Sequence, residues 1–288
     1  MYLPLKPIDR LSILFIVLLI GISLAGYAVI PHWPWLVARY GMLLCAIVAA
    51  SLAAAKKSTG TSTPQFHDFL PLIVIPVLFD SLGDMIPWLW THYFDDLLIR
   101  IDYGIFGVHP TVWMEKMIHP FLTNTLQFAY ISYYLIPLSL AIVLIRNRRS
   151  QEFDEAVFGI VLCFYLSYIG YLIFPAIGPR FTLSSLQTAN LQASDLTFAI
   201  QNTLNRLENT KTDAFPSGHT AIALMTLYYS VKFKERALSF ILTPIVSALI
   251  FSTVYLRYHY VVDVIAGVLL FMLTIYLAPR TNLLLSAK

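Results

Sequence analysis

Long apolar runs recur along the whole chain and constrain its fold more than any other feature. A helix of about 20 apolar residues spans the hydrocarbon core of a bilayer. Eight runs come near that length: 11–31, 34–55, 69–91, 122–145, 153–175, 216–231, 237–256 and 259–279. Only 12% of the residues are charged, about half of the roughly 25% found in soluble domains. We therefore expect an all-α, polytopic bundle of about eight transmembrane helices.

Positive charges predict how this bundle sits in the membrane. With eight spans, 12 of the 19 lysines and arginines fall on the side that holds both termini. Short cytoplasmic loops carry such an excess, so both termini are predicted to be cytoplasmic. We divide the membrane domain into two N-terminal helices (1–68) and a larger bundle (69–288) that carries the motifs described below. The net charge of +3 is too small to indicate a nucleic-acid partner.

Two stretches between spans are expected on the opposite, outer side. Residues 92–121 mix aromatic and charged residues, as helices lying in the membrane interface do. Their aspartates, Asp95, Asp96 and Asp102, are interpreted as solvated charges. Residues 176–215 form a polar loop, and loops of this length are uncommon unless they are functional or disordered. The loop leads directly into the short sixth run, whose first turn is expected to begin below the membrane surface.

His259 and Asp263 stand four residues apart at the start of the last run. This spacing places both side chains on one face of a helix. A carboxylate there can accept a hydrogen bond from one ring nitrogen, which leaves the other nitrogen free to attack an electrophile. It also stabilises the cation that forms when the ring is covalently modified. The alternative is a pair that merely caps a helix near the interface.

Pro216, Ser217, Gly218 and His219 open the sixth run. Proline suits the first turn of a helix, and glycine lets the backbone approach an anion closely. The N–H groups and the dipole at a helix start favour an anion at this point. His219 could then protonate a leaving oxygen as a general acid. The alternative is an ordinary helix start with an interfacial histidine.

Arg180 follows the fifth run on the same predicted outer side. A guanidinium can bind two phosphate oxygens at once, so we interpret Arg180 as a phosphate ligand. The alternative is an arginine that extends toward water from the membrane interface.

Together these motifs resemble a known family. The tetrapeptide 216–219 and the His259/Asp263 pair, with Arg180 upstream, are similar to the type 2 phosphatidic acid phosphatase superfamily of membrane lipid phosphatases and phosphotransferases. Residues 102–110 and 174–181 more narrowly resemble the branch that contains inositol phosphorylceramide synthases. The resemblance covers roughly residues 95–275.

The resemblance implies a role for each matching residue. His259 is the expected nucleophile, Asp263 its orienting partner, and His219 the acid that protonates the departing group. The phosphoryl oxygens are expected to contact three residues: Arg180, Ser217 and Gly218. The resemblance implies no metal and no cofactor, and it places the site at the outer, non-cytoplasmic membrane face of a helical bundle.

The chain departs from the hydrolytic members of this family at two positions. They usually carry a lysine where Ile173 stands and an arginine where Thr253 stands. A phosphate monoester carries about two negative charges at neutral pH and a diester one, so the loss of two cations suits a less charged group. Arg257, Lys211 and Arg206, on the same predicted side, are candidates to compensate. These losses resemble the sphingolipid phosphotransferase branches more than the simple phosphatases.

Three charged residues fall within the second and third predicted spans. Asp80 and Asp84 are four residues apart in the third span, and Arg39 lies in the second. An aspartate at mid-membrane costs about 2.5–3.5 kcal/mol, so we expect a structural ion pair with Arg39. Substrate headgroup binding is the functional alternative. The remaining histidines show no partner pattern and are expected to lie at surfaces: His32, His67, His92, His109 and His119.

The leading hypothesis is an integral membrane enzyme that cleaves a lipid phosphate or phosphodiester. The phosphoryl group would pass from His259 to water, as in a phosphatase, or to an acceptor lipid or alcohol, as in an inositol-phosphoryl-type transferase. The alternative is a transporter or channel, motivated by the charges within spans, although no inverted repeat is visible. A third hypothesis is a zinc site formed by His219, His259 and Asp263.

Overall fold

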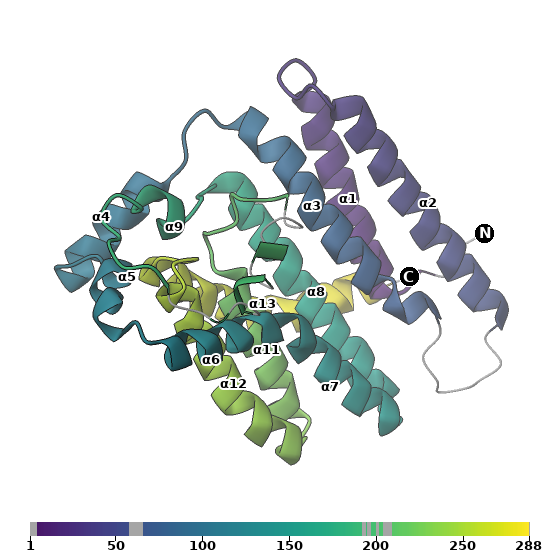
Figure 1. Cartoon of the computed structure of the whole chain (residues 1–288). Coiled ribbons are helices and arrows are strands. Elements are labelled where there is room, and N and C mark those ends of the chain that lie inside the picture. Colours follow the sequence, from purple (N-terminus) through teal and green to yellow (C-terminus); the bar gives the residue numbers. More distant parts are fainter. Residues whose placement is uncertain are drawn as a thin grey trace.

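The computed structural model describes residues 5–57, 66–191, 194, 197–199, 202–203 and 209–287. Within these residues the chain forms helices and no strands (Figure 1). In chain order the elements are α1 (Pro7–Ala25), α2 (Trp33–Lys57), η1 (Phe66–Phe69), α3 (Pro71–Leu89), α4 (Asp95–Phe106), α5 (Pro110–Trp113), η2 (Met114–Met117), α6 (Pro120–Ile131), η3 (Ser132–Tyr134), α7 (Leu135–Arg146), α8 (Ser150–Ile173), α9 (Pro179–Thr182), α11 (Gly218–Lys232), α12 (Arg236–Tyr255) and α13 (Val261–Ser286).

The predicted all-α polytopic bundle is confirmed. In the described part of the chain, seven helical segments are long and apolar enough to cross a membrane, one of them continuous through α6, η3 and α7. The sixth predicted run is helix α11, whose 15 residues extend about 22 Å, less than the roughly 30 Å of a bilayer core. The cytoplasmic placement of the termini and the division at residue 68 stay predictions.

Helix α8 lies in the middle of the bundle and contacts α1, α3, α7, α11 and α13 (Figure 1). Neighbouring helices bury side chains of α8 on most sides of the helix. Three of the buried residues are tyrosines spaced by about one turn: Tyr165, Tyr168 and Tyr171. The ring of Tyr165 stacks on Phe15 of α1 with centroids 4.4 Å apart. A helix that is apolar all round belongs in a core, and α8 is the element around which the others pack.

Two glycines let α8 and α13 approach the turn before α11 closely. A Cβ at Gly170 of α8 would lie 2.2 Å from Cδ of Pro216, and one at Gly267 of α13 would lie 2.6 Å from the carbonyl oxygen of Ser217. Real Cβ contacts essentially never fall below 3.0 Å. The start of α11 is therefore held between the two helices at a distance that only glycine permits.

Helices α4, α5 and η2 lie outside the long spans, as expected for residues 92–121. The outer face of α4 exposes large apolar side chains such as Tyr103 and Ile105. The prediction that its aspartates are solvated is wrong for two of the three. Asp96 is exposed, but Asp95 and Asp102 are only 4% and 2% exposed, because both accept hydrogen bonds from backbone N–H groups near the candidate site.

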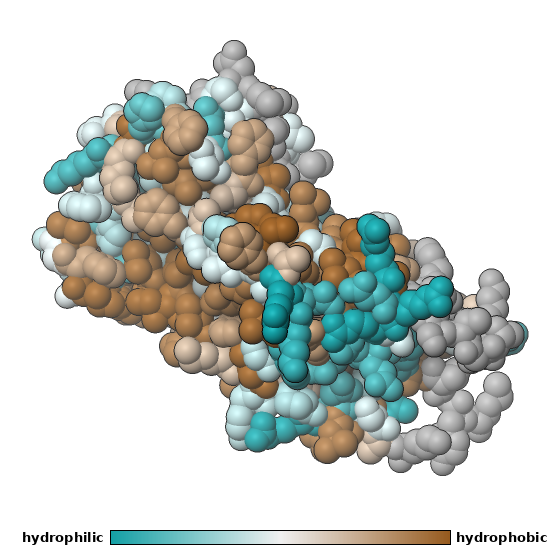
Figure 2. All heavy atoms as spheres, turned by 90° about the horizontal axis from the view of Figure 1, so that it is seen from below, coloured by the Kyte–Doolittle hydropathy of each residue, from teal (hydrophilic) through white to brown (hydrophobic). Residues whose placement is uncertain are grey.

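Ion pairs join the helix ends at the lower end of the bundle. Arg149, in the link between α7 and α8, contacts Glu152 and Glu235, and Lys232 at the end of α11 contacts Glu155. Seen from below, many hydrophilic residues gather in a patch beside a broad hydrophobic surface, and others lie at the edge of this face (Figure 2). This distribution suits helix ends at a membrane surface. The candidate site lies at the opposite end of α11.

Two predictions about titratable residues, those for Arg39 and for His67, can be compared with the structure. Arg39 binds Asp80 at 2.7 Å and approaches Asp84 at 3.6 Å, so the expected ion pair is confirmed. His67 was predicted to lie at a surface, and this prediction is wrong. Its side chain is 4% exposed, and Nε2 lies 2.9 Å from a carboxylate oxygen of Asp9, a partner 58 residues away that no local pattern indicates.

Candidate active site

The start of α11 is capped by its own motif. Ser217 is the N-cap residue, and its hydroxyl oxygen accepts hydrogen bonds from the N–H of Thr220 at 3.3 Å and from the Thr220 hydroxyl at 3.1 Å. The N–H of Ser217 donates to the carbonyl of Asp263 at 3.0 Å. Ser217 is fully buried and, like Gly218, does not line the cavity described below. The predicted phosphate contacts of these two residues remain untested.

The turn between α12 and α13 places His259 beside α11. The carbonyl of Thr253 accepts from the N–H groups of Tyr258 and His259 at 2.9 and 3.0 Å. Arg257, within the turn, adopts a φ of 66°, a left-handed conformation that reverses the chain. Thr253, which stands where the hydrolytic relatives carry an arginine, therefore contributes backbone contacts that shape this turn.

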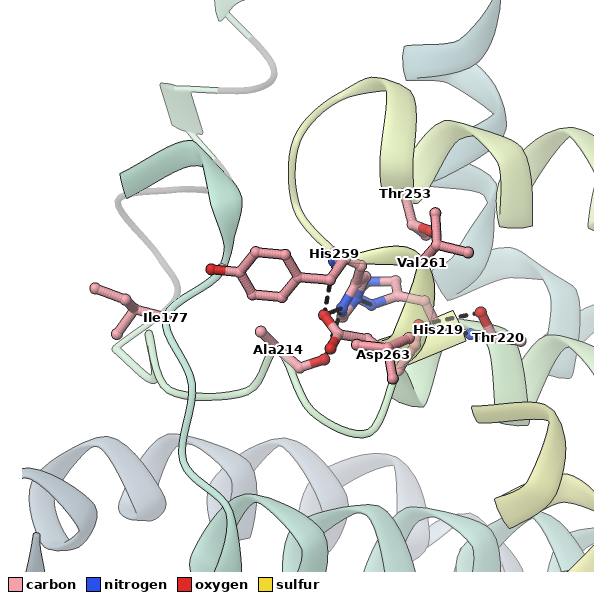
Figure 3. A network of polar contacts seen from close by, with 12 residues as sticks. Ile177, Ala214, His219, Thr220, Thr253, His259, Val261 and Asp263 are labelled. Atoms are coloured by element: carbon pink, nitrogen blue, oxygen red, sulfur yellow. Dashed lines mark hydrogen bonds and ion pairs between the residues drawn. The ribbon is translucent and has the colours of Figure 1, made fainter. Parts of the chain in front are cut away.

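The two histidines that the sequence singled out meet. Nε2 of His259 lies 3.4 Å from Nδ1 of His219, and the ring planes cross at 63° with centroids 5.5 Å apart. The labelled rings of His219, at the start of α11, and of His259, in the turn before α13, lie side by side (Figure 3). Residues 40 positions apart in the chain thus form one site, as the positions of the two motifs at helix starts predicted.

A main-chain carbonyl orients His259 more closely than the predicted carboxylate does. Nδ1 lies 2.7 Å from the carbonyl oxygen of Ala214 and 3.4 Å from Oδ2 of Asp263. Because a carbonyl only accepts, the ring proton sits on Nδ1 and the lone pair on Nε2 faces His219. Burial lowers the pKa of His259 to about 4. A histidine with this pKa carries a neutral ring at physiological pH.

Asp263 has a structural contact besides its approach to His259. Its Oδ2 accepts the N–H of Tyr260 at 2.8 Å, which forms a capping box at the start of α13. The other carboxylate oxygen is buried and has no hydrogen-bond partner among the described residues. Asp263 is fully buried, so its contacts fix the helix start on which His259 depends.

The rings border a small cavity of about 20 Å³, room for about one water molecule. Eight residues from four parts of the chain line it: Tyr130, Ile177, Arg180, Asp213, Ala214, His219, Tyr258 and His259. The guanidinium carbon of Arg180 lies 4.8 Å from the ring centroid of Tyr258. Arg180 thus lines the same cavity as both histidines.

Arg257 and Lys211 do not line this cavity. The Arg257 guanidinium donates to Glu115 at 2.8 Å and to the carbonyl of Ala189 at 2.6 Å. The guanidinium of Arg257, which the sequence analysis named as a candidate phosphate ligand, is thus already paired with a carboxylate. Lys211 is half-buried, and Arg206 lies outside the described residues.

Sequence reasoning missed the aromatic residues around His219. Tyr130 of α6 stacks on the His219 ring at 4.8 Å and on Tyr258 at 4.3 Å, and Tyr133 lies 4.3 Å from His219. Asp213, which lines the cavity, was also missed. Tyr130 and Tyr133 belong to an apolar run rich in aromatic residues, so no local signal separates them from ordinary core side chains.

The described part of the chain was compared with what a metal site requires, as the zinc hypothesis demands. There, no group of three or more His, Cys, Asp or Glu side chains is arranged to hold a metal ion. Nδ1 of His259 is directed at a carbonyl, which leaves one ring nitrogen on the cavity side. The zinc hypothesis therefore has no geometric support.

The fold and the site define an integral membrane protein in which two histidines and an arginine converge at helix ends. The chain belongs to the PAP2 superfamily, whose family model matches residues 98–277. A PA-phosphatase related-family protein of Dictyostelium discoideum is 24% identical over 261 residues, which cover 78% of this chain. The chain spans 46% of that relative's length. No solved structure matches.

Proposed function

We propose that this protein cleaves a lipid phosphate ester through a covalent phosphohistidine. Nε2 of His259 attacks phosphorus, the bond from phosphorus to the leaving oxygen breaks, and His219 gives its proton to that oxygen. Water or an acceptor hydroxyl then attacks the phosphohistidine, and His219 takes the proton of the attacking group. One observation carries the proposal: the Ala214 carbonyl holds the Nδ1 proton of His259, so the Nε2 lone pair is directed toward His219 at 3.4 Å.

Charges in the cavity support the proposed roles of His219 as the acid and of Arg180 as the group that stabilises the phosphoryl oxygens. The negative charge of a bound phosphate favours the protonated form of a nearby histidine, which His219 needs in order to act as the acid. Arg180 adds a fixed positive charge among the lining residues, where it can stabilise the transferring phosphoryl group. The aromatic rings of Tyr130 and Tyr133 pack on His219, and a less polar surrounding strengthens electrostatic interactions in the site.

The charge balance favours a phosphodiester over a monoester. Among the described lysines and arginines, Arg180 lines the cavity while Arg257 is paired with Glu115. Asp213 lines the same cavity, so its carboxyl group offsets part of this positive charge, and the lining suits the single negative charge of a diester better than the roughly two charges of a monoester. We therefore favour transfer of a phosphodiester-linked headgroup to an acceptor lipid or alcohol, on the non-cytoplasmic face of the membrane. The alternative reaction is hydrolysis that releases free phosphate, because the similar protein is described as phosphatase-related.

The experiment follows both products at once. Purified protein receives short-chain phosphatidic acid or phosphatidylinositol labelled with ³²P, with and without ceramide as acceptor. Hydrolysis releases labelled phosphate or headgroup phosphate, whereas transfer yields a new labelled lipid. His259→Ala should lower turnover by at least ~10³-fold, as loss of a nucleophile does.

The matched control is His92→Ala, because His92 is exposed in the described structure. Its turnover should equal that of the unmodified protein. Equal turnover in His259→Ala and His92→Ala would reject the phosphohistidine mechanism. Solute flux in proteoliposomes that persists in His259→Ala would instead support the transporter alternative, although its motivating charges, Arg39 and Asp80, are already paired.

A further inference from the structure

Helix α4 directs two carboxylates into the protein next to the candidate site. Asp95 and Asp102 are seven residues apart, about two turns, and so share one face of the helix. Both are almost fully buried, whereas Asp96 on another face is exposed. The outer side of α4 exposes Leu97, Ile101 and Ile105. An amphipathic helix of this composition lies with its apolar face in the membrane interface.

Asp102 caps the helix that follows the nucleophile. Its two carboxylate oxygens accept the N–H groups of Val261 at 2.9 Å and Val262 at 2.8 Å. These are the first two residues of α13, whose N–H groups have no partner inside the helix. A negative charge at a helix N-terminus is stabilising, and bonds to a charged acceptor are stronger than neutral ones. Asp102 therefore caps the start of α13, two residues after His259, together with Asp263.

Asp95 holds the segment that precedes Arg180. One oxygen accepts the N–H of Gly178 at 2.9 Å, and the other accepts the N–H of Ile177 at 3.0 Å. The hydroxyl of Tyr260 also donates to Asp95, at 2.8 Å. Tyr260 directly follows His259, so the Asp95 carboxylate adds a second link between the loop of Arg180 and the turn of His259, beside the direct hydrogen bond from the Arg180 N–H to the Arg257 carbonyl at 2.9 Å.

We propose that Asp95 and Asp102 are positioning residues that hold Arg180 and His259 in register from a helix outside the transmembrane bundle. Neither carboxylate touches the cavity, so each acts through the backbone it binds. This inference rests on the proposed function for its catalytic consequence. The contacts themselves join chain segments 82 to 165 residues apart.

The first test is Asp102→Asn in the full-length protein in detergent, with Asp96→Asn as the matched control. Asparagine keeps the size of the side chain, but its NH₂ group faces one of the two N–H donors and leaves it unsatisfied. Hydrogen exchange measured by mass spectrometry should show exchange of the Val261 and Val262 amides at least ~10-fold faster in Asp102→Asn. Asp96→Asn should leave both amides unchanged.

The second readout is turnover of the labelled lipids described above, with kcat and KM measured separately. A displacement of about 1 Å at reacting groups can cost about 10²-fold in rate. Asp102→Asn should therefore lower kcat ~10- to 100-fold while KM changes less than about 2-fold. A merely structural role would lower the amount of folded protein without this split.

The outcomes separate the positioning role from the proposed function. Unchanged exchange in Asp102→Asn overturns the positioning role, and so does faster exchange with unchanged kcat. If the unmodified protein turns over none of the lipids, the proposed function is rejected. If the Val261 and Val262 amides still exchange faster in Asp102→Asn, the capping role of Asp102 is supported independently of that function. If Asp102→Asn does not fold, Tyr260→Phe replaces it, because this change removes only the hydroxyl that contacts Asp95 and Thr182; Thr182→Val is measured beside it to separate the two contacts. The kcat of Tyr260→Phe should fall about 3- to 10-fold, and an unchanged kcat would oppose the role of Asp95.

Discussion

Gly267→Ala should disturb the candidate site because α13 touches the turn before α11 at this glycine. A Cβ there would lie 2.6 Å from the carbonyl oxygen of Ser217 and 3.0 Å from Cβ of Thr220. Ordinary contact begins at 3.4 Å, so the helices must separate by up to 0.8 Å (3.4 − 2.6). The strain falls on the hydrogen bond from the Ser217 N–H to the Asp263 carbonyl, which joins the two halves of the site.

Two opposing effects set the size of the stability change. Alanine in a helix interior is favoured over glycine by about 1 kcal/mol, whereas an extra methyl group in a packed core costs about 1–3 kcal/mol. The net change at Gly267 is therefore a loss of about 0–2 kcal/mol. Catalysis should suffer more. Since a misplacement of about 1 Å can cost about 10²-fold in rate, we expect kcat to fall about 10- to 100-fold.

The control for this prediction is Gly41→Ala in α2, where a new Cβ meets nothing within 4 Å. This variant should keep full activity and gain a little stability, because only the helix preference changes. Both variants are compared by thermal unfolding in detergent, followed by tryptophan fluorescence, and by initial rates of labelled lipid turnover. If Gly267→Ala and Gly41→Ala are equally active and equally stable, the close packing of α13 on α11 has no part in forming the site.

Three further predictions concern the chemistry of the site. His219→Ala should slow an alkyl phosphate ester at least ~10²-fold but p-nitrophenyl phosphate much less, because a good leaving group needs no proton; equal losses in initial-rate assays would contradict the role of His219 as acid. The lowered pKa of His259 (about 4) means that the folded site favours the neutral ring. The acidic limb of kcat/KM should therefore lie well below pH 6.5, and the stability that this ring contributes should be present above pH 6.5 and be lost as pH falls toward 4; a limb near 6.5 in the pH–rate profile would contradict this assignment. Arg180→Ala should lower kcat/KM at least ~10²-fold, whereas Arg257→Ala should mainly lower the unfolding temperature by breaking the pair with Glu115; a larger kinetic effect at Arg257 would reverse the two roles.

The sequence by itself determined the class of fold and the parts of the chain that could meet. Hydropathy over about 20 residues is a local property, so the spans were readable without coordinates. Pro216 and Ser217 mark a helix start through local capping chemistry, and the four-residue spacing of His259 and Asp263 follows from helix periodicity. Both motifs open helices, which is why His219 and His259 could be expected at one end of the bundle. The ion pair of Arg39 was readable because a charge within a span needs a partner.

Only the tertiary structure decided which groups form hydrogen bonds and ion pairs with one another. The Ala214 carbonyl lies closer to His259 than Asp263 does, and any residue type offers such a carbonyl, so no sequence pattern marks it. The burial of Asp95, and the pairing of Arg257 with Glu115 across 142 positions, depend on how α4, η2 and the loops fold back onto the bundle. Periodicity shows which face a residue takes on its own helix. The packing of helices distant in sequence determines what that face meets.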